Sequence, residues 1–114
     1  MANNVRLTGF FLRKAKRLLK KYHSLQSSLK ELEKDLMINP RLGDNYGSNI
    51  YKVRLADESK GKGKSGGFRV ITYLIEESEI STEIYLITIF DKSEESSIDK
   101  DDIKAIIKSE GLNL

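Results

Sequence analysis

The sequence predicts an α+β fold, in which an antiparallel-dominated sheet of about four strands packs on an N-terminal helical hairpin and is followed by a C-terminal helix. Two observations support this prediction. Apolar residues recur at helical spacing in the first third of the chain, whereas the middle third holds β-branched and alternating segments. Strands that follow one another through short turns pair antiparallel, and the helices are then expected to cover one face of the sheet. At 114 residues the chain is expected to form a single domain, residues 1–114.

A weak strand and an amphipathic helix open the chain. Residues 4–7 alternate in polarity, so Val5 and Leu7 are expected to point inward. Thr8 has the type of side chain that caps helix N-termini. The helix that follows it, residues 9–22, places apolar side chains on one face and basic side chains on the other.

A second helix and a loop complete the N-terminal half. Ser24 is a candidate N-cap, and leucines at helical spacing from Leu25 onward form an apolar stripe. Pro40, the only proline, ends this helix, and the short link between the two helices implies an antiparallel hairpin. Residues 41–49 are rich in Gly, Asn and Asp, so a loop is expected there.

Three strands and a helix account for the rest of the chain. The strands are predicted over residues 50–55, 68–75 and 83–90, from alternating or β-branched sequence. Between the last two strands, the acidic residues 76–82 are expected to form a turn. The final helix is predicted over residues 100–110, where isoleucines line one face.

The composition excludes several kinds of chemistry. The chain has no cysteine, which excludes disulfides, thiolate nucleophiles, zinc knuckles and iron–sulfur clusters. His23 is the only histidine, which excludes a histidine-rich metal site, and we expect neither a metal nor a cofactor. An apolar run of about eighteen residues and a signal-peptide pattern are both absent. These features predict a cytoplasmic protein without a membrane partner.

Charges are segregated along the chain, although the net charge is only +3. Residues 1–23 carry seven basic side chains and no acidic one, residues 52–69 have a net charge of +4, and residues 76–102 have a net charge of −8. This asymmetry suggests that one surface meets a polyanion, either nucleic acid or a very acidic protein. Lysines that solvate a long helix would give the same pattern over residues 1–23.

The strongest candidate site is a set of cations on the predicted strands. Lys52 and Arg54 share one strand face, opposite Tyr51 and Val53. These two cations can converge with two others from the neighbouring strands, Arg69 and Lys92, below a flexible Gly-rich loop that carries Lys60, Lys62 and Lys64. A cationic sheet face suits binding of an RNA backbone, and the same charges also suit an edge strand that is kept soluble. Phe68 either belongs to the core or stacks on an RNA base.

Four segments of the sequence closely resemble RelE/HigB-type toxins of bacterial type II toxin–antitoxin modules. They are Asn-Pro-Arg-Leu-Gly at residues 39–43, Tyr-Lys-Val-Arg-Leu-Ala at 51–56, the run from Lys60 through Lys-Ser-Gly-Gly-Phe-Arg-Val-Ile at 60–71, and Leu-Ile-Thr-Ile-Phe-Asp-Lys-Ser at 86–93. The resemblance extends over residues 5–108. It implies a RelE-like compact sheet on a helical hairpin, and ribosome-dependent cleavage of mRNA that a cognate antitoxin neutralises.

The resemblance also implies roles for the candidate cations in a metal-independent attack of the 2′-hydroxyl on the scissile phosphate. Lys52 is implied as a base or phosphate binder, Arg54 as its companion and Arg69 as the main transition-state clamp, with Lys92 completing the catalytic set. The chain departs from the family after the last strand, because RelE has an arginine where this chain has Ser93, and neither histidine nor tyrosine follows Phe90. Asp91 is a candidate proton acceptor in their place, or a structural cap.

Two other functions stay open at this point. The first is a ParE-like toxin that inhibits DNA gyrase through protein contacts, and the second is a catalytically decayed member of the fold that only binds RNA or its antitoxin. In each case we expect a cognate antitoxin as partner, acidic over the segment that binds the cationic face or the hairpin groove. The nuclease function adds mRNA on the ribosome as a second partner.

Overall fold

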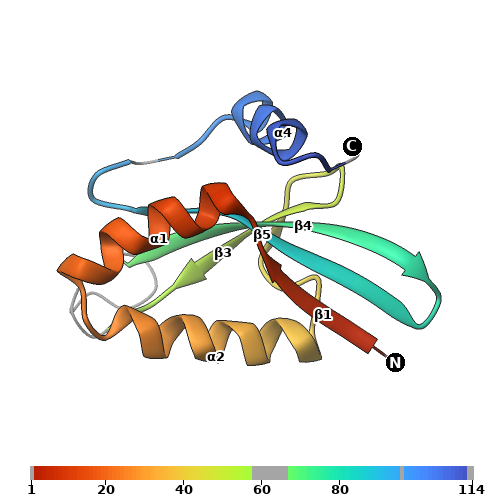
Figure 1. Ribbon diagram of the computed structural model, residues 1–114, viewed down its shortest axis with the longest axis horizontal. Coiled ribbons are helices and arrows are strands. Elements are labelled where there is room, and N and C mark those ends of the chain that lie inside the picture. Colours follow the sequence, from red (N-terminus) through yellow and green to blue (C-terminus); the bar gives the residue numbers. More distant parts are fainter. Residues whose placement is uncertain (1, 58–66, 96, 113–114) are drawn as a thin grey trace.

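A computed structural model describes residues 2–57, 67–95 and 97–112, which form a five-stranded sheet and three helices (Figure 1). The elements in chain order are β1 (Ala2–Leu7), α1 (Gly9–Lys21), α2 (Leu25–Ile38), β2 (Asp44–Asn45), β3 (Ile50–Leu55), β4 (Phe68–Ser78), β5 (Ser81–Asp91) and α4 (Lys100–Ser109). The strand order is β1-β5-β4-β3-β2. Every neighbouring pair is antiparallel except β1 and β5, which are parallel. The predicted α+β class is confirmed, and the short strand β2 raises the strand count to five.

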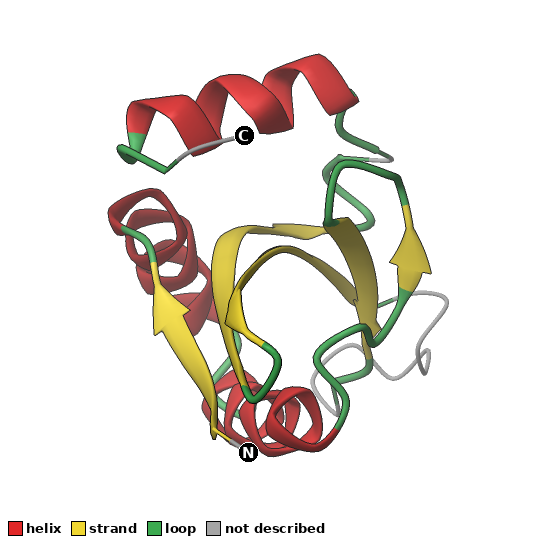
Figure 2. Ribbon diagram, turned by 90° about the vertical axis from the view of Figure 1, so that its right-hand side faces the viewer, coloured by secondary structure: helices red, strands yellow, loops and turns green. Residues whose placement is uncertain are grey.

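Helices cover both faces of the sheet, so the prediction that they cover one face is wrong. α1 and α2 pack on one face, and α4 packs on the other (Figures 1 and 2). Leu18 and Leu36 of the hairpin meet Phe68 and other strand residues in the larger core cluster, whereas Ile103 and Ile107 of α4 belong to a second cluster. Within the described part of the chain, no helix has the length and apolar character that crossing a bilayer requires.

The predicted start of α1 is confirmed by the contacts of Thr8. Its hydroxyl oxygen accepts a hydrogen bond from the Phe11 N–H at 3.1 Å and donates one to the Leu86 carbonyl oxygen at 2.8 Å. The first bond satisfies one of the free N–H groups of the first helical turn. The second joins the helix to β5, so this cap contributes to tertiary structure as well.

Two N-terminal side chains differ from the prediction. Val5 packs against the core, but Leu7 is half exposed, because it ends an edge strand at the rim of a small cavity of about 140 Å³. Ser24 occupies the N-cap position of α2 without capping it, since its hydroxyl donates to Asp57 at 2.7 Å. Ser28 donates to the same buried carboxylate at 2.7 Å. Asp57 thus joins the beginning of α2 to the chain after β3.

The hairpin of β4 and β5 is longer than predicted. The expected acidic turn over residues 76–82 is mostly strand, because the two strands stay paired up to Ser78 and Ser81 and only two residues connect them. Two acids of this hairpin have partners from elsewhere in the chain. Glu83 is buried and forms an ion pair with Arg6 at 3.0 Å, and Glu76 forms one with Arg41.

Candidate functional site

Two arginines face each other across the central strands. β3 pairs with β4 in a register that sets Arg54 opposite Arg69 and Lys52 opposite Ile71. Residues that are directly opposed share a face of the sheet, and Ile71 packs in the cluster that α4 covers. Lys52, Arg54 and Arg69 therefore lie on the α4 side of the sheet, away from the helical hairpin.

Arg69 is a buried cation. It is only 4% exposed, and its Nη1 donates to the carbonyl oxygen of Phe68 at 3.2 Å. Burial lowers the pKa of Arg69 below its ordinary value, the charge of Arg54 lowers it further, and Asp44 and Tyr46 act in the opposite direction. Because an arginine still keeps its proton at neutral pH, two positive charges are held close together. Such a pair favours an anion that binds both, as phosphate oxygens do.

The short strand β2 brings two further residues to this face. Asp44 of β2 is paired with Lys52, and the ring centre of Tyr46, just after β2, lies 5.1 Å from Lys52 Nζ. Our sequence interpretation missed both residues, because it assigned residues 41–49 to a loop without a function. The available signal was their position, since an acid and an aromatic residue directly precede the cationic strand.

A cavity of about 440 Å³ lies along the edge of β3. Residues 52–56 line one wall, and Glu31 and Asp35 of α2 line the other, so the cavity lies on the hairpin side of the sheet. Carboxylates repel phosphate, and the side chains of Lys52 and Arg54 belong to the opposite face of the sheet, so this cavity does not suit a nucleic-acid backbone. On that opposite face Arg54 is exposed and Lys52 half-buried, whereas Arg69 is covered. A phosphate therefore reaches Arg54 and Lys52 first.

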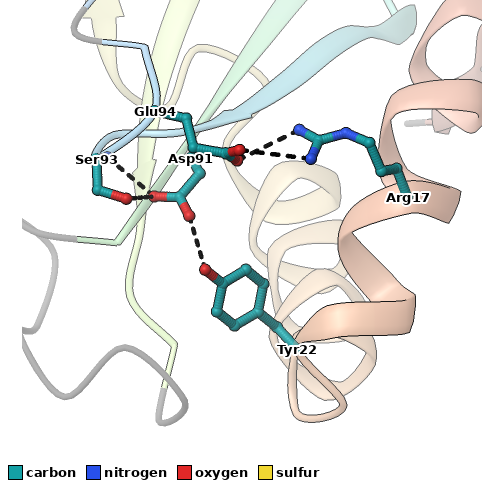
Figure 3. A network of polar contacts seen from close by, with 5 residues as sticks. All are labelled: Arg17, Tyr22, Asp91, Ser93 and Glu94. Carbon is teal, nitrogen blue, oxygen red and sulfur yellow. Dashed lines mark hydrogen bonds and ion pairs between the residues drawn. The ribbon is translucent and has the colours of Figure 1, made fainter.

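Lys92 follows the last residue of β5, near the start of β4. Its N–H donates to the carbonyl oxygen of Gly67 at 3.1 Å, two residues before Arg69. The turn after β5 is also joined to α1 by an ion pair of 3.3 Å between Arg17 and Glu94 (Figure 3). These contacts fix the backbone of Lys92 near Arg69. They do not determine whether the ammonium group of Lys92 lies near the two arginines.

Asp91 has a structural role on the other side of the sheet. Its carboxylate is 1% exposed and accepts hydrogen bonds from the Tyr22 hydroxyl at 2.9 Å and from the Ser93 N–H and hydroxyl at 2.9 and 2.8 Å (Figure 3). Asp91 is paired with Phe68, which packs toward the hairpin. The carboxylate is therefore directed away from Arg69, which favours the structural interpretation of Asp91 over that of a proton acceptor.

Four residues outside the catalytic set were predicted to contact RNA, and the structure describes one of them. Phe68 is fully buried, with its ring 5.2 Å from that of Tyr22 in an edge-to-face contact. Its core interpretation is confirmed and the stacking interpretation is wrong, because strand alternation puts Phe68 on the face opposite to Arg69. The remaining three lie outside the described residues: Lys60, Lys62 and Lys64.

The chemistry that this arrangement supports is stabilisation of negative charge. Guanidinium and ammonium groups bind phosphate oxygens and favour a transition state in which phosphate charge increases. Across residues 2–57, 67–95 and 97–112, His, Asp and Glu side chains do not gather in groups of three or more that could hold a metal ion. The described site is thus a cationic surface formed by side chains of β3 and β4.

Comparison with known proteins identifies the class. Residues 5–111 match the sequence profile of the family described as the RelE toxin of the RelE/RelB toxin–antitoxin system. The match covers nearly the whole chain, so the protein is a toxin-type member of the toxin–antitoxin systems. More particularly, the chain belongs to the RelE toxin family, as its motifs predicted, and this membership implies a cognate antitoxin as its partner.

A solved structure shows the same fold. The Escherichia coli toxin RelE, a double arginine-to-alanine mutant in the free state, superposes with a TM-score of 0.59. The alignment covers 96% of this chain and 97% of the other, at 18% sequence identity. The resemblance therefore extends to the whole architecture, including the helical hairpin and the sheet.

Proposed function

We propose that this protein is a ribosome-dependent mRNA endoribonuclease that inhibits translation and that its cognate antitoxin neutralises. The observation that carries the proposal is the opposed pair Arg54 and Arg69, with Lys52 on the same face. Two guanidinium groups and an amine at one place are more than the solubility of an edge strand requires, because one of the guanidinium groups is buried.

The proposed reaction uses the RNA's own 2′-hydroxyl as nucleophile. The 2′-oxygen attacks the adjacent phosphorus while its proton passes to a base, the bond from phosphorus to the 5′-oxygen breaks, and the 5′-oxygen takes up a proton. The products are a 2′,3′-cyclic phosphate and a 5′-hydroxyl. Rate enhancement then depends on holding the nucleotide for in-line attack and on stabilising the charge of the phosphorane.

Each cation of the site has a part in this reaction. Arg54 is exposed and receives the scissile phosphate. Arg69 exchanges the Phe68 carbonyl oxygen for a phosphate oxygen, and its planar guanidinium then binds the phosphorane. Lys52 binds a phosphate oxygen or acts as the base that takes the 2′-hydroxyl proton. Lys92 and the lysines of residues 60–64 bind the flanking backbone.

One observation favours a binding-only member of the fold as the second candidate. By the resemblance of its motifs to the family, Ser93 takes the place of an arginine, and in this chain neither histidine nor tyrosine follows Phe90. A toxin with this departure would retain the cationic face for RNA or antitoxin without the groups that complete catalysis. Inhibition of gyrase by a ParE-like mechanism is the remaining alternative, and it does not need these cations for RNA cleavage.

The decisive experiment is cleavage of a defined mRNA by the purified protein, with and without translating ribosomes. Wild type is compared with Arg54→Ala and Arg69→Ala, and with Lys34→Ala, which removes an exposed cation of α2, a helix on the opposite face of the sheet from the two arginines. We expect ribosome-dependent fragments with 5′-hydroxyl ends, a loss of rate of roughly 100- to 1,000-fold for Arg69→Ala, and a wild-type rate for Lys34→Ala.

Absence of cleavage by folded wild-type protein would reject the nuclease proposal. A gyrase supercoiling assay then tests the ParE-like function, and an RNA and antitoxin binding assay tests the binding-only function. Cleavage that Arg54→Ala and Arg69→Ala both leave unchanged would place the active site elsewhere on the molecule.

A further inference from the structure

One cation–π contact in the described structure joins β3 to the turn that precedes it. The other three involve α1 and its C-cap, between residues at most four positions apart, so helical or sequential proximity accounts for them. The contact between Lys52 Nζ and the ring of Tyr46, at 5.1 Å, instead spans the turn between β2 and β3. It exists only if this turn is folded, and it involves a residue of the proposed active site.

The turn that carries Tyr46 is strained and firmly held. Residues 47–49 have three consecutive positive φ angles, 81°, 55° and 63°, two of them at residues other than glycine. Three backbone hydrogen bonds fix this conformation. Tyr46 N–H donates to the Ile50 carbonyl oxygen at 2.8 Å, Ile50 N–H to the Gly47 carbonyl oxygen at 3.0 Å, and Leu74 N–H to the Asn49 carbonyl oxygen at 3.0 Å. Strain of this kind persists where the surroundings enforce it, and it gathers at functional sites.

We propose that Tyr46 is a positioning residue, whose ring holds the Lys52 ammonium group on the face that Arg54 and Arg69 share. This inference rests on the proposed function, in which Lys52 acts on the substrate. The backbone of Lys52 is held as well, because a Cβ at Gly43 would lie 2.4 Å from the Lys52 carbonyl oxygen. The ring and this close backbone contact together limit where the ammonium group can go.

Kinetics of ring-retaining and ring-removing variants test the proposal. Tyr46→Leu is expected to lower kcat about 2- to 30-fold, the range of a cation–π contact, with little change in KM because Arg54 and Arg69 still bind phosphate. Tyr46→Phe keeps the ring and is expected to recover most of this rate. In a Lys52→Ala background, Tyr46→Leu is expected to add no further loss, because Tyr46 acts through Lys52.

A matched control and a spectroscopic readout separate positioning from a general loss of structure. Phe10→Leu removes the same kind of contact from α1 and is expected to leave cleavage unchanged. With ¹³C-dimethylated lysines, the NMR signal that Lys52→Arg removes is expected upfield of the exposed lysines, because it lies over a ring. It stays there in Tyr46→Phe and joins the other signals in Tyr46→Leu.

Three results would overturn the proposal. They are a Tyr46→Phe protein as slow as Tyr46→Leu, which would assign the function to the hydroxyl; a folded Tyr46→Leu protein with wild-type kcat; and a Lys52 signal without an upfield shift. Wild-type protein that fails to cut mRNA on ribosomes rejects the proposed function separately. In that case the positioning role is judged by the Lys52 signal and by the affinity of each variant for ribosomes programmed with 2′-deoxy-substituted mRNA.

Discussion

Replacing Gly67 by alanine perturbs the pairing of β3 and β4 directly beside the two arginines. A Cβ at this position would lie 2.2 Å from the Leu55 carbonyl oxygen and 3.2 Å from the Ala56 Cα, whereas an ordinary contact begins at 3.4 Å. Both obstacles are backbone atoms, so β3 has to move by roughly 1 Å at the residue next to Arg54. Overpacking of this kind costs about 1–3 kcal/mol of the free energy of unfolding. A displacement of about 1 Å in a catalytic group costs about 100-fold in rate.

Two measurements test this reasoning. Urea unfolding followed by circular dichroism gives the change in the free energy of unfolding, and cleavage of mRNA on ribosomes gives the change in rate. The matched control is Gly9→Ala, because a Cβ there meets no backbone atom and lies at ordinary contact distance from two side-chain ends, Glu110 at 3.4 Å and Arg13 at 3.6 Å. It is expected to be neutral or slightly stabilising, since alanine is the better helix former. A Gly67→Ala protein that equals wild type in both stability and rate would refute the argument.

Three further predictions concern stability. Tyr22→Phe removes the hydroxyl that donates to the buried Asp91 carboxylate, and is expected to lower the free energy of unfolding by about 1.5–3 kcal/mol in urea titration; an unchanged midpoint contradicts it. Thr8→Ala removes the cap of α1 and is expected to cost about 1 kcal/mol in thermal melting, whereas Thr8→Ser is expected to cost less. Burial raises the pKa of Tyr73 above its ordinary value of 10.0, so above about pH 10 the unfolded state ionises first and stability falls. Tyr73→Phe should therefore lose less stability than wild type between pH 9 and 11, and equal losses would count against this assignment.

The elements of this fold were predictable because their signals are local. The amphipathic pattern of α1, the cap at Thr8 and the β-branched strands all depend on residues within a few positions of one another. The predictions failed where a distant partner changes the outcome. The sequence of the acidic segment 76–82 predicts a turn, but most of it is strand, and one of its acids, Glu76, is neutralised by Arg41, which is far away in the sequence.

The residues of the candidate site also divide into those that local sequence signals predicted and those that depend on distant contacts. Alternation in the sequence placed Lys52 and Arg54 on one strand face, and the family motifs pointed to Arg69. The residues that complete the site were not predictable, because Tyr46 meets Lys52 only through a turn with positive φ angles, in a segment that reads as a loop.

By itself, the sequence determined the class of fold, most of the element boundaries, the family and the identity of the candidate cations. The tertiary structure alone decided that β1 lies parallel to β5, that helices cover both faces, and that Arg69 is buried opposite Arg54 while its neighbour Phe68 packs under the hairpin. The physical reason is the distance along the chain over which each interaction acts. Periodicity and capping act within one element, whereas burial, and the meeting of two charges, depend on the register between strands that are distant in the chain.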